Sequence, residues 1–268
     1  MRFRALTLML LGIVPLAALA SAEPDSAAPK TRVALFTDPA STDRRSREAA
    51  WRLLSAEGGF AAERLTTAGV FARRLADCDV FVIPGGTGNG IARALGMEGC
   101  ALVTRRVNEG MGCVAICAGG YLVVEGWSPE TRSIELLNAK SWDDEHWARG
   151  EGFIAVKMQG RDYGESSHTM WFENGPIFVP GTISGIGAYV PLVRYVTDMA
   201  APDAPKGMME GRDAAIAGEL GKGRAVAFGP HPEMSPGLGH WLVNSVRWAG
   251  SSDRGSSATA ETVLEGKR

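Results

Sequence analysis

Apolar residues in the first half of the chain form short, nearly continuous runs, separated by longer segments with helical spacing. Such runs are typical of strands that are buried on both faces of a parallel sheet. We expect strands at residues 32–37, 62–66, 79–83 and 113–116, and helices at 42–57, 91–110 and directly after 117. This alternation predicts a parallel sheet with right-handed crossovers and helices on both faces.

The second half of the chain has a different pattern, in which short strand-like segments are parted by Gly and Pro turns. A core strand is expected at 224–228 and a closing helix at 238–248. The chain is therefore predicted to be α/β, with one domain at 31–249. Antiparallel additions to the sheet are expected at 134–140, 153–158, 169–172, 188–196 and 214–220.

The two ends of the chain differ from this domain in composition. Residues 1–22 join a basic start to an apolar run shorter than the ~20 residues of a membrane span, and end on small residues that suit a cleavage site. We expect an export signal there, a polar linker at 23–30, and a secreted or periplasmic mature protein without membrane insertion. An uncleaved anchor is the alternative. The Ser-, Gly- and Ala-rich tail at 250–268 is expected to be disordered.

Charge and glycine distribution narrow the function classes. The chain has 28 Lys and Arg against 30 Asp and Glu, a net charge of −2, so it lacks the basic field that nucleic-acid binding requires. Glycines gather in short runs such as 85–86 and 119–120, which predicts tight functional turns. The run at 85–90 lacks the Gly-Lys-Ser/Thr ending of a phosphate-binding loop, so no nucleotide cofactor is expected.

Four cysteines are too few for a disulfide scaffold, and their spacing fits neither a zinc site nor a redox motif, so no metal is expected. A strand from Cys113 to Cys117 would hold its ends about 13 Å apart at ~3.3 Å per residue, beyond disulfide reach. One disulfide bond between two of Cys78, Cys100 and Cys113 is compatible with the sequence, and it would leave Cys117 as an unpaired thiol.

Cys117 stands between a predicted strand and a predicted helix, the context of a nucleophile elbow, and its neighbours are small. The helix N-terminus behind it favours the thiolate, although a small core residue is the alternative interpretation. His231 and Glu233 follow the core strand at the same sheet edge, where one can act as base and the other can orient it. Backbone N–H groups of Gly86 and Ala118 are the expected oxyanion donors.

Three motifs occur in order along the chain: VFVIPGG at 80–86, GCVAICAGGYL at 112–122 and GPHPE at 229–233. This set resembles the class I glutamine amidotransferase-like proteins, and most closely the biotin-protein ligase N-terminal domain family, over roughly residues 32–249. The resemblance implies a single flavodoxin-like, three-layer domain with a mostly parallel sheet and antiparallel additions. It also implies a catalytic triad of Cys117, His231 and Glu233. Ala115 departs from the glycine usual two residues before the nucleophile.

Other polar clusters have less specific patterns. Residues 142–147 (WDDEHW) suit a metal site or an aromatic pocket wall, but a solvated acidic loop is the preferred interpretation. For Trp171, Glu173 and Asn174, a cleft border and an ordinary turn are equal alternatives. His168 and His240 are expected on the surface or on a helix face.

These patterns predict an exported cysteine hydrolase that acts on a small-molecule or peptide amide through a thioester at Cys117. No acceptor domain or ATP motif is found, so hydrolysis is expected in place of ammonia transfer, and biotin ligation is excluded because no ligase domain is present. The alternative is a non-catalytic module that binds a small ligand or peptide in the same cleft.

Overall fold

The computed structural model describes residues 30–72, 74–126, 134–160, 167–253, 255 and 257–267. The predicted export signal at 1–22 lies outside the described residues, as does the linker at 23–30 except for Lys30. No helix in the described part of the chain is long and apolar enough to cross a membrane.

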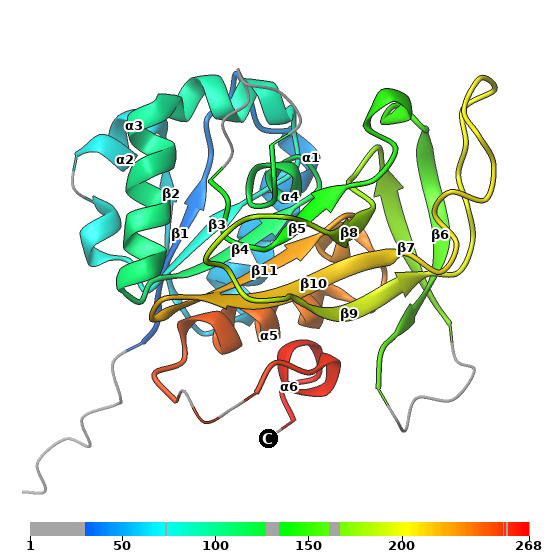
Figure 1. Cartoon of the computed structure of the whole chain (residues 1–268). Helices are drawn as coiled ribbons and strands as arrows, with labels where there is room; N and C mark the ends of the chain where they lie inside the picture. Colours follow the sequence, from blue (N-terminus) through cyan, green and yellow to red (C-terminus); the bar gives the residue numbers. More distant parts are fainter. Residues whose placement is uncertain are drawn as a thin grey trace, which may run out of the picture.

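One half of the sheet is parallel and forms the left part of Figure 1, with strand order β2-β1-β3-β4-β11. Each of these strands pairs in parallel with the next, as the alternation of strand and helix predicts. β3, β4 and β11 are buried along their whole length, which explains their continuous apolar sequences. The strands are β1 (Arg32–Phe36), β2 (Ala61–Leu65), β3 (Val80–Ile83), β4 (Gly112–Ile116) and β11 (Gly223–Phe228).

The other half is antiparallel and continues the sheet through β10, β9, β6 and β7, while the short strands β5 and β8 pair off this path. The sheet was expected to be mostly parallel, but its parallel part is smaller than expected, because the strands from β5 to β10 pair with one another in antiparallel fashion. β8 was not predicted because a three-residue strand is too short to show periodicity. The strands are β5 (Ala139–Ser141), β6 (Glu151–Met158), β7 (His168–Glu173), β8 (Phe178–Pro180), β9 (Val190–Tyr195) and β10 (Asp213–Leu220).

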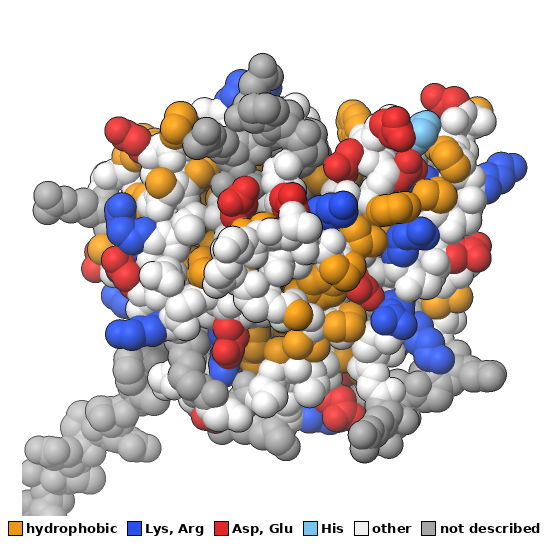
Figure 2. Space-filling view, viewed as in Figure 1, with side chains coloured by type: hydrophobic (Ala, Val, Ile, Leu, Met, Phe, Trp, Pro, Cys, Tyr) orange, Lys and Arg blue, Asp and Glu red, His pale blue; other side chains and the backbone are white. Residues whose placement is uncertain are grey.

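Helices cover both faces of the parallel half. The side chains of β1 show this, because they alternate between two hydrophobic clusters, one on each face of the sheet. Val33 and Leu35 belong to the cluster that contains α5, whereas Ala34 and Phe36 belong to the one that contains α3. The helices are α1 (Arg44–Arg52), followed by a π-helical turn (Leu53–Glu57), α2 (Thr67–Phe71), α3 (Gly88–Glu109), α4 (Ala118–Leu122), α5 (Gly239–Gly250) and α6 (Ala260–Leu264). On the face in Figure 2, acidic and basic side chains are interspersed.

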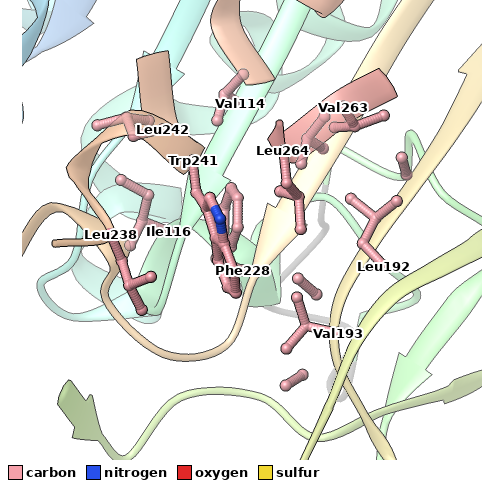
Figure 3. Close-up of a cluster of buried hydrophobic side chains, with 14 of the residues drawn as sticks. Val114, Ile116, Leu192, Val193, Phe228, Leu238, Trp241, Leu242, Val263 and Leu264 are labelled. Atoms are coloured by element: carbon pink, nitrogen blue, oxygen red, sulfur yellow. The ribbon is translucent and has the colours of Figure 1, made fainter. Parts of the chain in front are cut away.

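The C-terminal segment corrects the expectation of a disordered tail at 250–268. α6 begins with a capping box at Thr259, and its Val263 and Leu264 are completely buried. Figure 3 shows these two side chains beside Trp241 of α5 and Leu192 of β9. A single helical turn is too short to stand out in a polar sequence, although its burial against α5 and β9 stabilises it.

All four cysteines are free thiols, so the disulfide left open among Cys78, Cys100 and Cys113 does not form. These three lie within one hydrophobic cluster. Burial raises the pKa of Cys78 to about 11 and that of Cys113 to about 12, which keeps both as inert thiols near neutral pH.

Candidate functional site

Three loops meet at the carboxyl edge of the parallel strands. In the sheet, Ile83 of β3 pairs with Ala115 of β4, and Phe228 of β11 pairs with Ile116. The residues that follow these strands therefore leave the sheet side by side. This register brings the glycine turn after β3, Cys117 after β4 and the His-Pro-Glu segment after β11 to one place.

The backbone at Cys117 has the strained geometry of a nucleophile elbow, with φ 50° and ψ −108°. Its N–H donates to Phe228 O over 2.8 Å, which fixes the turn. Small residues are required next to it, since a Cβ on Gly119 would lie 2.5 Å from Ile83 O, and one on Gly120 would lie 3.0 Å from Phe228 O. The small neighbours seen in the sequence therefore have the steric role expected of them.

His231 and Glu233 form a buried pair, with His231 Nδ1 2.7 Å from Glu233 Oε1. His231 directly precedes a 3-10 turn (Pro232–Met234) that contains Glu233. The His231 N–H donates to Trp171 O over 2.7 Å, so that β7 fixes the histidine backbone. Burial lowers the pKa of His231, but Glu233 and then Cys117 raise it, and the net direction is well above the ordinary value.

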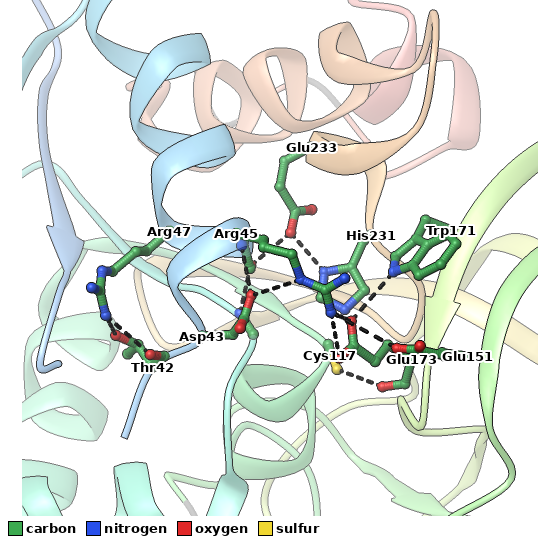
Figure 4. A network of polar contacts seen from close by, with 12 residues as sticks. Thr42, Asp43, Arg45, Arg47, Cys117, Glu151, Trp171, Glu173, His231 and Glu233 are labelled. Carbon is green, nitrogen blue, oxygen red and sulfur yellow. Dashed lines mark hydrogen bonds and ion pairs between the residues drawn. The ribbon is translucent and has the colours of Figure 1, made fainter. Parts of the chain in front are cut away.

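The thiol of Cys117 donates to Glu173 O over 3.2 Å, as Figure 4 shows. His231 Nε2 is buried and has no hydrogen-bond partner in the described part of the chain. The sulfur and the imidazole are adjacent, since Cys117 is among the groups that raise the pKa of His231. The hydrogen bond of the thiol in this structure is to the Glu173 carbonyl oxygen.

Ser46 is a site residue that the sequence did not reveal. Its hydroxyl on α1 donates to Glu233 Oε1 over 2.7 Å and accepts from the Gly85 N–H over 2.9 Å. Ser46 is completely buried, and it links the glycine turn to the Glu233 carboxylate. A serine inside an amphipathic helix gives no signal of this role. Gly85 is tightly enclosed as well, since a Cβ there would lie 2.6 Å from His231 Cε1.

Gly86 and Ala118 both line the pocket beside Cys117, where the sequence places oxyanion donors. Gly86 has φ 154°, and a Cβ there would lie 2.2 Å from Ser41 O. The neighbouring N–H of Gly85 is already bound by Ser46. No acceptor for the Gly86 N–H is found among the described residues, which leaves this group free to bind a ligand oxygen.

The pocket at this edge has a volume of about 480 Å³. One wall comes from the antiparallel half: Glu173 ends β7 and Asn174 follows it, while Asp144 and Trp147 follow β5. The cleft-border alternative for Glu173 and Asn174 is thereby confirmed. The full lining is Asp43, Gly86, Thr87, Gly88, Asn89, Cys117, Ala118, Tyr121, Asp144, Trp147, Glu173, Asn174 and His231.

The acidic segment at 142–147 is not simply a solvated loop. Asp143 has a buried side chain that pairs with the buried Arg149 and with His146 over 2.8 Å. Asp143, Glu145 and His146 hold potential metal-ligand atoms within 4.8 Å of one another, but the Arg149 cation at Asp143 already supplies the charge that a metal would bring.

The two remaining histidines lie outside the pocket lining. His168 packs edge-to-face on Trp241, and His240 contacts Gly237 O over 2.9 Å.

Comparison with known proteins finds no family model and no curated protein that matches the chain. Among solved structures, the chain is similar to a ThuA-like protein from Parabacteroides merdae, with a TM-score of 0.55 and 12% identity, covering 88% of this chain and 96% of that one. It is also similar to PurLQS from Thermotoga maritima, with a TM-score of 0.51 and 18% identity, covering 76% of this chain and 88% of that one. These two similarities show a shared α/β fold.

A third similarity is to a β-galactosidase from Bacillus circulans sp. alkalophilus, with a TM-score of 0.49 and 11% identity. The match covers 85% of this chain and 31% of the β-galactosidase, so the chain spans about a third of that protein's length.

Proposed function

We propose that the pocket is the active site of a cysteine-dependent amide hydrolase, with Cys117 as nucleophile, His231 as base and Glu233 as the group that orients the base. The observation that carries this proposal is the convergence of a strained cysteine elbow and a buried His–Glu pair in one pocket, with His231 Nε2 unpartnered. Strain and buried, strongly shifted groups are typical of catalytic sites.

The proposed reaction proceeds through an acyl thioester. The thiol proton passes to His231 Nε2 while the sulfur attacks the amide carbon, and the carbonyl oxygen becomes an oxyanion that the Gly86 and Ala118 N–H groups bind. Each such donor contributes about 3–4 kcal/mol in known hydrolases. His231 then gives its proton to the departing amine. Water, deprotonated by the same histidine, hydrolyses the thioester and regenerates the thiol.

Glu233 and Ser46 support the base in this scheme. The Glu233 carboxylate at Nδ1 stabilises the imidazolium that forms when Nε2 takes the proton, which agrees with the upward shift of the His231 pKa. To start the reaction, the thiol turns from Glu173 O to His231 Nε2.

Two further parts of the proposal rest on the sequence. The ordered motifs around Gly86, Cys117 and His231 resemble the biotin-protein ligase N-terminal domain family, and the shared fold with the ThuA-like protein and PurLQS is compatible with that resemblance. Residues 1–22 support export of the protein.

A non-catalytic binding module is the second candidate. The observation that favours it is the thiol donation to Glu173 O, which leaves Cys117 without a hydrogen bond to its base. The same carbonyl would hold the thiol in its protonated form. A ligand in the pocket would then contact Cys117 without a reaction.

The test is the rate of alkylation of Cys117 by iodoacetamide between pH 5 and 9, read by mass spectrometry of the folded protein. An active site predicts fast labelling near pH 6, slowed by His231→Asn. The buried Cys113 is the internal control and should stay unlabelled. The hydrolase proposal is falsified if Cys117 reacts no faster than a free thiol, or if His231→Asn leaves its pH–rate profile unchanged.

A further inference from the structure

The pocket has a one-sided charge. Asp43, Asp144 and Glu173 are among its lining residues, and no Lys or Arg is among them. The His231 Nε2 atom, whose side chain is 2% exposed, faces the same pocket without a partner. The carboxylates therefore belong to a cavity that already contains an unpaired buried group, and they are not merely an exposed acidic cluster.

Two of these carboxylates share one cation from outside the lining. Arg45 of α1 binds Glu173 over 2.8 Å through both carboxylate oxygens, and it lies 3.9 Å from Asp43. Figure 4 shows Arg45 between these two residues. One guanidinium against two carboxylates leaves net negative charge on this side of the pocket.

Asp144 forms no ion pair within the described residues, and its Oδ1 atom is buried without a hydrogen-bond partner. Burial raises the pKa of Asp144, and the hydrogen bond with Ser141 and the charge of Lys140 offset this only in part. An unpartnered carboxylate oxygen in a pocket wall is stabilised by a donor with positive charge.

Aromatic side chains accompany Asp144. Trp147 directly follows the 3-10 turn that contains Asp144, lines the same pocket and is 57% exposed. Burial raises the pKa of Tyr121, and the nearby Cys117 and Asp144 raise it further. Tyr121 lines the pocket together with both of these residues. An exposed indole beside a carboxylate is a favourable environment for an ammonium or guanidinium group.

We propose that the ligand of this pocket is an amide that carries a positive charge, with its ammonium or guanidinium group held by Asp144 against Trp147 while the amide carbonyl lies at Cys117. A free amino acid such as glutamine carries a carboxylate as well as an ammonium group. It fits less well because the lining has no Lys or Arg, and its histidine, His231, is already paired with Glu233. The cleavage of this amide rests on the proposed function, whereas its recognition does not.

The first experiment measures ammonia release from two matched pairs of primary amides. The first pair is leucinamide, whose ammonium group is next to the amide, and the neutral N-acetyl-leucinamide. The second pair is Nα-acetyl-lysinamide, whose ammonium group is at the end of the side chain, and the neutral N-acetyl-norleucinamide. We expect kcat/KM to be roughly tenfold higher for the charged member of at least one pair, with the difference falling as salt rises. Glutamine serves as the zwitterionic comparison and should be cleaved less well than the preferred cation.

Two variants test the assignment to Asp144. Asp144→Asn should remove most of the roughly tenfold preference, by lowering kcat/KM for the cationic amide much more than for the neutral amide. Glu145→Gln, on the same turn but outside the lining, is the matched control and should retain the preference. Trp147→Leu should lower kcat/KM for the cationic amide a few fold, because the indole no longer contacts the positive charge. Equal losses for both members of a pair, or no preference in the unmodified protein, overturn the inference.

The second experiment measures binding of the same amides to the Cys117→Ala protein by calorimetry. Selective binding of a cation without turnover by the unmodified protein supports the inference and refutes the hydrolase. Turnover that ignores charge supports the hydrolase and refutes the inference. If no amide binds and none is cleaved, the inference is also overturned.

Discussion

The parallel and antiparallel halves of the sheet contribute different parts of the same pocket. The parallel half supplies Cys117, Gly86 and the His231–Glu233 pair from loops at one sheet edge. The antiparallel half supplies Glu173, Asn174, Asp144 and Trp147 as one wall. Under the proposed function, the parallel half carries the chemistry and the antiparallel half carries the selectivity, so substitutions in each half should change different kinetic constants.

The largest effect should come from the nucleophile in the parallel half. Cys117→Ala should reduce hydrolysis to background, a loss on the order of 10⁴ to 10⁶ in kcat, and adding His231→Asn should lower it no further because the two residues act as a unit. Amide hydrolysis by the single and double variants would be measured, with thermal melting to show that both fold. A double variant much slower than the single one would contradict a shared catalytic role.

Glu233→Gln should reduce kcat by about 10⁴ while retaining the hydrogen bond geometry at His231 Nδ1. The folded-state pKa of His231 is raised, so the stability from its protonated form is complete below the unfolded value of about 6.5 and is lost as pH rises through the higher folded value. Removal of the carboxylate charge should therefore cost more stability at pH 6 than at pH 9. Denaturant unfolding at the two pH values and NMR titration of the imidazole check this expectation.

Ser46→Ala should reduce kcat by roughly 10- to 100-fold, because a hydrogen bond to the buried carboxylate of Glu233 is lost. The pH–rate profile should shift as well, since Ser46 acts through Glu233 on the base. Ser55→Ala, an exposed serine on the adjoining π-helical turn, is the control. If the melting temperature falls while the pH–rate profile stays unchanged, Ser46 contributes to packing and does not act on the base.

The smallest effect is expected where the two halves meet. Arg45→Gln removes the exposed ion pair with Glu173, which is worth at most about 1 kcal/mol and is screened by salt. The pocket becomes more negative without this guanidinium, so KM for a cationic amide should fall a few fold at low salt. The value of kcat should change little. A large drop in kcat would show that the wall also positions the thiol through Glu173 O.

The same contrast explains what the sequence could predict. β3, β4 and β11 have largely apolar sequences because they are buried along their whole length, and the motifs in the loops that follow them could be recognised from their order along the chain. For Asp144 and Trp147 the sequence offered a pocket wall only as an alternative to a solvated loop, because a wall residue is defined by neighbours that are distant in sequence. Ser46 depends on a contact with Glu233 across the fold. α6 and β8 are too short to show periodicity and are stabilised mainly by their packing.

The order of the site residues along the chain affects how the protein is made. Cys117 leaves the ribosome early, His231 follows only after all of β5 to β11, and α6, which packs against the helix after His231, comes later still. At translation rates of ~5–20 residues per second, the thiol precedes its base by on the order of ten seconds. The growing polypeptide therefore lacks a complete site during most of its synthesis. The proposed triad can form only after β11, the last strand, has joined the sheet.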